Sequence, residues 1–314
     1  MLIKMQVGEQ DRGELQVNVT DSDNAPIRDA RVTISEPETA INPNSPIERL
    51  ETDVSGQTQI VDLNTPPLEY SLNENNENMP YANYNIQIEA PGYETENISN
   101  VEILPDSLSL QDVRMRRREG EQVENIDIDP HTLYAEYPEK IPEDEIKDVN
   151  EPGEIVLSRV VIPEYVVVHN GMPSSNARDY YVTYKDYIKN VASSEIYATW
   201  PRATIEANVL AIMSFTLNRV YTEWYRNKGY DFTITSSTAY DQKWIYGRNI
   251  FQSIDEVVDE IFDQYLSRPD VRQPILTQYC DGKRVTCPNW LSQWGSCNLG
   301  EQGFGTLEII RNYY

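Results

Sequence analysis

The strongest constraint on the fold lies between Thr183 and Gly229, where two helices are predicted on either side of one acidic residue, Glu195. Thr183, followed three residues later by Asp186, is typical of a capping box that opens a first helix. Pro201 has the fixed φ that suits the first turn of a second helix, which we expect to stop near Gly229. Small or apolar side chains recur along the second helix at three- and four-residue steps, at Ile205, Val209, Ile212, Thr216, Val220 and Trp224. Glu195 is therefore predicted at a helix-helix junction whose second helix is anchored in a core.

The predicted surroundings of Glu195 favour its protonated form. A carboxylate at the carbonyl end of a helix meets the negative end of the helix dipole, and Ile196, Tyr197 and Trp200 would exclude water from it. A carboxyl group of this kind can donate a proton near neutral pH. The alternative is a solvated glutamate at a helix end with no chemical role.

The segment around Glu195 resembles the central motif of the SpoIID/LytB family, whose catalytic acid is the glutamate before a Met-Pro pair. Glu195 occupies that position, and Trp200 and Pro201 match the Trp-Pro pair that follows it in the family. The match continues along the next helix at Ala207, Ala211, Thr216, Leu217 and Arg219.

A second block of residues agrees with the same family in the same order. LSQWGS, from Leu291 to Ser296, is similar to the family's closing MSQYGA, and it is followed by Gly303 and by LEIIRNYY from Leu307 to Tyr314. The resemblance covers about residues 160 to 314 and is closest to the spore cortex-lytic enzymes of clostridia.

The resemblance implies a lytic transglycosylase that cuts the β-1,4 bond between N-acetylmuramic acid and N-acetylglucosamine in peptidoglycan. The 6-hydroxyl of the muramyl ring attacks its own anomeric carbon and forms a 1,6-anhydro product, so one carboxyl group can replace the usual two. Glu195 would serve first as acid to the leaving oxygen and then as base to the 6-hydroxyl. The resemblance implies a role in spore germination, and we expect no cofactor.

Several aromatic and amide side chains are candidates for substrate binding. Aromatic faces stack on sugar rings and amides bond to acetamido groups, although each of these residues could equally be ordinary packing, since the chain has 21 tyrosines. The candidates are Tyr197, Trp200, Tyr240, Gln242, Tyr246, Ser292, Gln293 and Trp294. Three of them lie in SSTAYDQKWIYGRN, where the family has a substrate loop.

The sequence gives little support for a metal site or a cysteine nucleophile. The two histidines, His131 and His169, lie in no recognisable ligand or partnering motif, and many family members carry histidine and cysteine in the middle loop where this chain has none. Cys280, Cys287 and Cys297 do not have zinc-ligand spacing. We favour a disulfide between Cys280 and Cys287 with Cys297 free, and three reduced core thiols remain an alternative.

Charge and composition divide the chain into three regions. Residues 1–118 carry 9 basic and 21 acidic side chains, residues 119–154 carry 2 and 13, and residues 155–314 carry 15 and 17. Residues 1–118 contain short alternating segments split by Gly and Pro, and they resemble the carboxypeptidase regulatory-like, transthyretin-type β-sandwich. The acidic, Pro-containing residues 119–154 are typical of a solvated linker that a protease could cut, and residues 155–314 form the SpoIID/LytB-like part.

We therefore expect an α+β catalytic domain of SpoIID type preceded by an all-β domain. The charge distribution favours a zymogen with a pro-region before about residue 150 and an activating protease, although a mere acidic spacer is an equal alternative. The expected partner is the peptidoglycan glycan strand, with no nucleic acid and no membrane span.

The expected location is the spore cortex or coat, as the resemblance implies. The first residues lack a signal-peptide pattern, which fits a spore protein made in the mother cell and equally a truncated or intracellular chain. A wall-binding domain could follow Tyr314. Two other functions stay open: a catalytically silent peptidoglycan-binding or spore-coat protein, and an N-acetylmuramoyl-L-alanine amidase.

Overall fold

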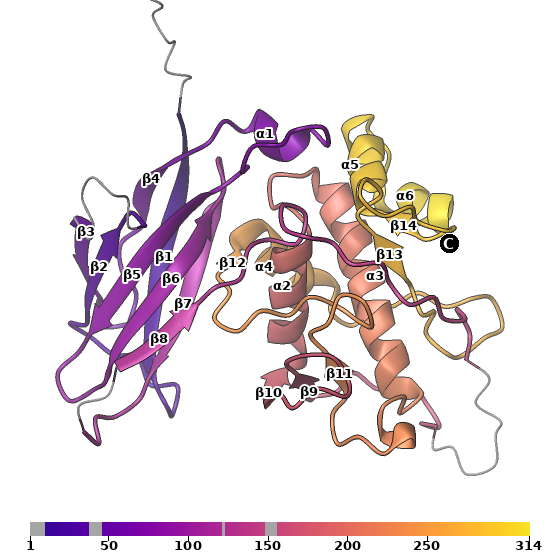
Figure 1. Ribbon diagram of the computed structural model, residues 1–314, viewed down its shortest axis with the longest axis horizontal. Helices are drawn as coiled ribbons and strands as arrows, with labels where there is room; N and C mark the ends of the chain where they lie inside the picture. The colour runs from indigo at the N-terminus through magenta and orange to yellow at the C-terminus, as the bar shows by residue number, and fades with distance from the viewer. Residues whose placement is uncertain (1–9, 38–45, 121–122, 148–155) are drawn as a thin grey trace, which may run out of the picture. The chain divides into compact units, whose positions relative to one another are not determined.

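The computed structural model describes residues 10–37, 46–120, 123–147 and 156–314, and it has a mixed α/β fold with several sheets and few helices (Figure 1). The chain divides into two compact units. The first, here called the N-unit, comprises residues 1–130, 197–199 and 246–252. The second, the C-unit, comprises residues 131–196, 200–245 and 253–314.

The N-unit is built from two sheets. Its strands are β1 (Asp11–Asp21), β2 (Arg31–Ser35), β3 (Pro46–Glu51), β4 (Val61–Thr65), β5 (Ala82–Glu89), β6 (Thr95–Ile103), β7 (Leu108–Met115), β8 (Val123–Asp127) and β12 (Ile250–Phe251), with a short helix α1 (Glu69–Leu72). One sheet has the order β12-β7-β1-β4 and the other the order β3-β2-β5-β6-β8. The alternating segments predicted from the sequence are therefore strands.

Alternation of apolar and polar side chains explains how the two sheets share a core. Val17 and Val19 in β1 are buried, as are Val32 and Ile34 in β2 and Ile86 in β5, while the residues between them face outward. Because side chains of a strand alternate between its faces, each sheet keeps one apolar face for the core and one polar face.

A segment from late in the chain completes the first sheet. β12 pairs antiparallel with β7, joining Ile250 to Leu110. The neighbouring Arg248 donates to a carboxylate oxygen of Glu102 at 2.8 Å, and both side chains are buried. The first domain was expected to end at residue 118. The N-unit also contains residues 246–252, so it is not one continuous segment of the chain.

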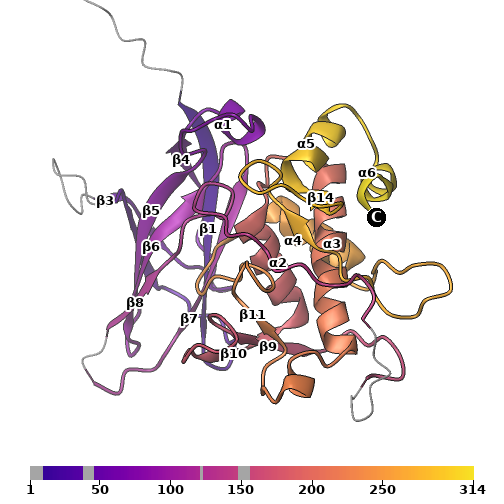
Figure 2. The same ribbon diagram turned by 45° about the vertical axis from the view of Figure 1, so that its right-hand side comes forward.

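The C-unit carries the helices. They are α2 (Tyr184–Glu195), α3 (Arg202–Tyr221), α4 (Gln252–Ile261), α5 (Gln293–Glu301) and α6 (Thr306–Tyr313), with a short 3-10 turn (Arg226–Lys228). Its strands are β9 (Tyr165–His169), β10 (Asp179–Thr183), β11 (Ile234–Thr235), β13 (Tyr279–Cys280) and β14 (Leu291–Ser292). Helix α3 contacts α2, α5 and α6, which lie around it in Figure 2. In the described part of the chain, no helix is both long and apolar enough to cross a bilayer.

The helix starts agree with the sequence better than the helix ends. The Thr183 side chain accepts from the Asp186 N–H at 3.2 Å, which confirms the predicted N-cap. Pro201 is the cap residue of α3 rather than part of its first turn. The prediction that this helix runs to Gly229 is wrong, because it ends at Tyr221 and the backbone at Glu223 has a left-handed φ of 47°.

Residues 123–147 contradict the expected solvated linker. Val123–Asp127 forms β8, which pairs in parallel with β6. Further along, side chains of the C-unit are buried, among them those of His131, Leu133, Tyr137 and Lys140. Acidic and proline content predicted solvation, but the apolar, aromatic and lysine side chains between those residues provide enough buried contact to order the segment.

Candidate functional site

Glu195 is the last residue of α2 and lies at the junction with α3, as the sequence predicted. Its side chain is fully buried, with 0% of its surface exposed. One carboxyl oxygen, Oε1, accepts from the Lys243 N–H at 2.7 Å, and the other, Oε2, accepts from the Tyr279 hydroxyl. The Gln293 side chain donates to the Glu195 carbonyl at 3.1 Å. The carboxyl group is therefore held in one orientation by Lys243 and Tyr279, and Gln293 holds the backbone of the same residue.

Burial determines the protonation of Glu195. It raises the pKa of this carboxyl above its ordinary value, and the charge of Lys140 and the hydrogen bonds from Tyr279 and Lys243 lower the pKa by less. Burial, and next the charge of Glu195, raise the pKa of Tyr279 well above its ordinary value, so the phenol remains a proton donor. The arrangement suits a carboxyl group whose protonated form is favoured by burial and whose carboxylate form is stabilised by two donors.

The ordered segment from His131 to Lys147 contributes buried groups to the surroundings of Glu195. The Lys140 ammonium lies 4.1 Å from the centroid of the Tyr279 ring and donates to the Asp241 carbonyl at 2.9 Å. The Tyr137 hydroxyl is buried and has no hydrogen-bond partner. Burial, followed by the charge of Glu195, raises the pKa of Tyr137. In this form solvent does not reach Glu195, and one of the buried groups around it, the Tyr137 hydroxyl, makes no hydrogen bond.

A buried ion network lies next to the site. Arg219, at the end of α3, donates to Asp241 at 2.7 Å and to both carboxylate oxygens of Glu143. Asp241 also accepts from the Tyr225 and Thr235 hydroxyls, each at 2.6 Å. This network fixes the backbone just before Lys243, which is the residue that donates to Glu195.

The structure does not support Gln242 as a substrate-binding residue. Its Oε1 accepts from the Tyr187 hydroxyl at 3.0 Å and from the Thr216 hydroxyl at 2.9 Å, and its Nε2 donates to the Ile212 carbonyl at 3.0 Å. The side chain is fully buried. The amide joins α2 to α3, and its contact with substrate stays a prediction.

The remaining predicted substrate residues are dispersed. Trp200 and Trp294 are both buried and lie 5.1 Å apart between ring centroids. Ser292 accepts from the Gly295 N–H and caps α5. Gln293 contacts Glu195, and its Oε1 is buried without a partner.

The three predicted tyrosines are divided between the two units. Tyr240 is partly buried in the C-unit, and its carbonyl accepts from Arg219. Tyr197 and Tyr246 belong to the N-unit, where Tyr246 donates to Glu124 at 3.3 Å. Among the predicted substrate residues, Gln293 donates a hydrogen bond to the backbone carbonyl of Glu195.

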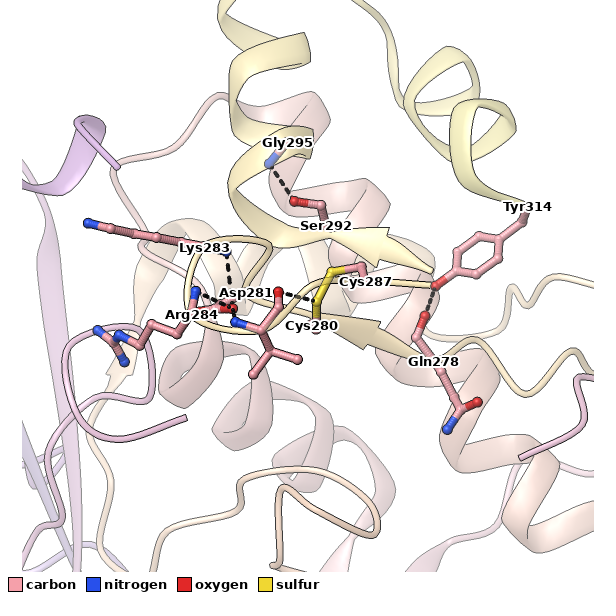
Figure 3. Close-up of a disulfide and its surroundings, with 10 residues drawn as sticks. Gln278, Cys280, Asp281, Lys283, Arg284, Cys287, Ser292, Gly295 and Tyr314 are labelled. Atoms are coloured by element: carbon pink, nitrogen blue, oxygen red, sulfur yellow. Dashed lines mark hydrogen bonds between the residues drawn. A yellow bond between two sulfur atoms is a disulfide. The ribbon is translucent and has the colours of Figure 1, made fainter. Parts of the chain in front are cut away.

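Cys280 and Cys287 form a disulfide, the pairing that we favoured (Figure 3). Cys297 is buried and takes no part in this disulfide. Inside the loop, the Asp281 carboxylate accepts from three successive backbone N–H groups, those of residues 283–285. Gly282 has a left-handed φ of 79°, and a Cβ there would collide with the Ser292 hydroxyl. The disulfide therefore closes a tight loop directly after Tyr279.

The histidines have structural partners. His169 contacts Asp179 through Nδ1 at 2.7 Å and Ser175 through Nε2 at 3.2 Å, an order of groups found in serine hydrolases. However, the Ser175 hydroxyl donates to the Met172 carbonyl at 2.7 Å, so its proton is already engaged. No group of three His, Cys, Asp or Glu residues suited to a metal occurs among residues 10–37, 46–120, 123–147 and 156–314.

Three residues that act on Glu195 were not predicted from the sequence: Tyr279 by a hydrogen bond, and Lys140 and Tyr137 through charge. Tyr279, Lys140 and Tyr137 lie 84, 55 and 58 residues away from Glu195. The only signal in the sequence was that Tyr279 precedes the predicted Cys280–Cys287 disulfide. This indicated a constrained loop, but it did not show that the loop lies next to Glu195.

Comparisons with known proteins do not assign a family. No family model matches the chain, and no curated protein matches it. Among solved structures, catechol 1,2-dioxygenase from Acinetobacter radioresistens is 13% identical over 38% of this chain and 58% of its own, with a TM-score of 0.25.

Two further structural similarities are equally weak. The minor pilin GBS52 of Streptococcus agalactiae is 16% identical over 36% of this chain and 48% of its own, with a TM-score of 0.24. The Bacillus anthracis TIE protein covers 34% of this chain and 17% of its own, with a TM-score of 0.22. At these TM-scores the similarities carry no functional argument.

Proposed function

We propose that this protein is a peptidoglycan lytic transglycosylase in which Glu195 is the only catalytic acid and base. The observation that carries the proposal is the Glu195 carboxyl, which has a raised pKa and accepts one hydrogen bond on each oxygen. The sequence resemblance supports it, because Glu195, Trp200 and Pro201 occupy the matching positions of the SpoIID/LytB motif. No cofactor is required for this reaction.

In the proposed reaction, protonated Glu195 gives its proton to the glycosidic oxygen as the bond from that oxygen to the muramyl anomeric carbon breaks. The Tyr279 hydroxyl and the Lys243 N–H then stabilise the carboxylate. The carboxylate removes the proton of the muramyl 6-hydroxyl, whose oxygen bonds to the anomeric carbon. The ring closes to a 1,6-anhydro sugar, and Glu195 is protonated again.

We further propose the finer fold assignments. The C-unit is assigned to the SpoIID type, supported by the two ordered blocks of matching residues. The N-unit is assigned to the carboxypeptidase regulatory-like, transthyretin type, supported by its two sheets and by its sequence pattern. The sequence resembles the catalytic region of the clostridial spore cortex-lytic enzyme SleC. We therefore propose that the activity serves spore cortex degradation during germination.

We propose that the described form is the inactive form of a zymogen. Glu195 is fully buried, so a glycan can reach it only after part of its cover moves. Lys140 and Tyr137 are the best candidates to move, because a buried ammonium and an unpaired buried hydroxyl are costly to keep. The cleavage expected near Glu151 lies outside the described residues.

The test is product analysis on purified spore cortex. The full chain is compared before and after limited proteolysis, and muropeptides are identified by mass spectrometry. We expect anhydro-muramyl ends from the treated protein and none from a Glu195→Gln variant, whose amide cannot transfer the proton. Glu301→Gln, a change of an exposed glutamate on α5, is the matched control and should keep full activity. Anhydro products from Glu195→Gln would refute the assignment.

The complete burial of Glu195 also favours a second candidate, a catalytically silent peptidoglycan-binding protein. In that case cortex would bind to the protein, but neither the intact nor the cleaved chain would release products. Release of free stem peptides would instead indicate an amidase.

A further inference from the structure

The outer face of the five-stranded sheet in the N-unit carries an ordered row of polar side chains. One residue from each strand lies in register with its neighbour across the whole sheet: Arg49 in β3, Thr33 in β2, Gln87 in β5, Asn97 in β6 and Asn125 in β8. The side chains of all five point away from the core, because the residues on either side of them along β2, β5 and β6 are buried.

Three amides of the row are joined by hydrogen bonds between side chains. Gln87 Nε2 donates to Asn97 Oδ1 at 3.0 Å, and Asn97 Nδ2 donates to Asn125 Oδ1 at 3.0 Å. Each amide nitrogen has two N–H donors and each amide oxygen has two lone pairs, so one link uses only part of this capacity. The links orient the amide planes before any ligand arrives, which reduces the entropy lost on binding.

A second row lies beside the first. The Asn100 side chain donates to Asp127 at 2.7 Å, and the Asn100 N–H donates to the Asn85 side chain at 3.3 Å. Both rows line one groove of about 1220 Å³. Single small-molecule sites usually span about 300–1,000 Å³, so this groove has room for a segment of a polymer.

We propose that this groove binds an extended β-1,4-linked glycan rich in acetamido groups, with the chain running across the strands. Neighbouring strands of a sheet are about 4.8 Å apart, which is close to the length of one sugar ring in such a chain. Successive rings can therefore meet successive amides of the row. Gln87, Asn97 and Asn125 are uncharged, which suits hydroxyl and acetamido groups.

The chemistry of the groove disfavours other polymers. An extended peptide usually pairs its backbone with a sheet edge, and this surface is a sheet face. A nucleic acid needs a basic groove, whereas the two arginines that line this groove, Arg31 and Arg49, are balanced by Glu89 and Asp127. Arg31 is also paired with Glu89. The proposal goes beyond the proposed transglycosylase activity, since it concerns binding by the N-unit and requires no turnover.

The experiment measures binding of a chito-hexaose, the β-1,4-linked hexamer of N-acetylglucosamine, to the full chain by titration calorimetry. All proteins carry Glu195→Gln, so that cleavage does not affect the result. We expect Asn97→Ala to weaken binding by about tenfold or more. Asn125→Ala, on the edge strand β8, should weaken binding in the same direction with less risk to folding.

The matched control is Asn18→Ala. Asn18 also donates to a side chain across strands, to Asp112 at 2.8 Å, but it lies in the other sheet of the N-unit. This variant should bind like the parent protein. Failure of the parent to bind chito-hexaose, or unchanged affinity in both the Asn97 and Asn125 variants, would overturn the proposal. Neither result bears on Glu195 chemistry, which is tested by cortex products.

Discussion

Replacing Tyr279 by phenylalanine tests the most specific feature of the candidate site. The substitution removes only the hydroxyl that donates to Glu195 Oε2. The ring is buried, with 1% of its surface exposed, and it also packs against the Lys140 ammonium at 4.1 Å. Phenylalanine keeps this packing, so the main loss is one hydrogen bond to the carboxyl group.

The size of the effect follows from that hydrogen bond. A hydrogen bond to a charged group contributes about 1.5–3 kcal/mol, and each 1.36 kcal/mol is a factor of ten in a rate or equilibrium constant. Without the hydroxyl the carboxylate form of Glu195 is less stable, so the pKa of Glu195 should rise further. We expect turnover of the activated protein to fall by about tenfold to a hundredfold. The high-pH limb of its rate profile should move to higher pH.

Two measurements check this prediction. The first is the pH profile of anhydro-muramyl product formation. The second is titration of the Glu195 carboxyl by infrared difference spectroscopy on the intact chain, with Glu195→Gln used to assign the band. Tyr187→Phe is the control, because the Tyr187 hydroxyl bonds to Gln242 and not to Glu195. A Glu195 titration in Tyr279→Phe that stays unchanged or moves to lower pH would refute the reasoning.

Three further predictions concern stability. Burial raises the pKa of the Glu96 carboxyl to about 7, and the charge of Glu124 contributes to this rise. The bound proton therefore stabilises the folded protein fully at low pH, and this stability is lost as pH rises through about 7. Glu96→Gln should therefore raise the thermal midpoint at pH 8 and leave it nearly unchanged at pH 5, and equal shifts at both pH values would contradict this. Cys287→Ser opens the disulfide loop and should cost about 2–3 kcal/mol in denaturant unfolding, whereas an unchanged midpoint would mean that the loop is not constrained in solution. Asp241→Asn leaves the buried Arg219 with an incomplete set of acidic partners and should cost about 3–5 kcal/mol, and a loss below about 1 kcal/mol would show that this pair is solvated.

The disagreements between sequence and structure have a common cause. The sequence predicted α3 to Gly229 from spacing, but the buried contacts of Arg219 and the left-handed backbone at Glu223 end it earlier. The acidic and proline content of residues 119–154 predicted a solvated linker. Composition alone does not show that the side chains of Tyr137 and Lys140 are buried in the folded protein. In both regions, contacts with distant parts of the chain outweigh local preference.

The sequence by itself determined the local features of this protein: the strands of the N-unit, the N-cap at Thr183, and the place of Glu195 at the end of α2. These depend on alternation, capping and helix periodicity, which act over a few residues. Only the tertiary structure decided which groups surround Glu195, since Tyr279 and Lys140 reach it from far along the chain. It also decided that β12 completes a sheet of the N-unit, and that amides from three strands meet in one row. Pairing between distant segments depends on how the whole chain buries its apolar surface, and no short stretch of sequence carries that information.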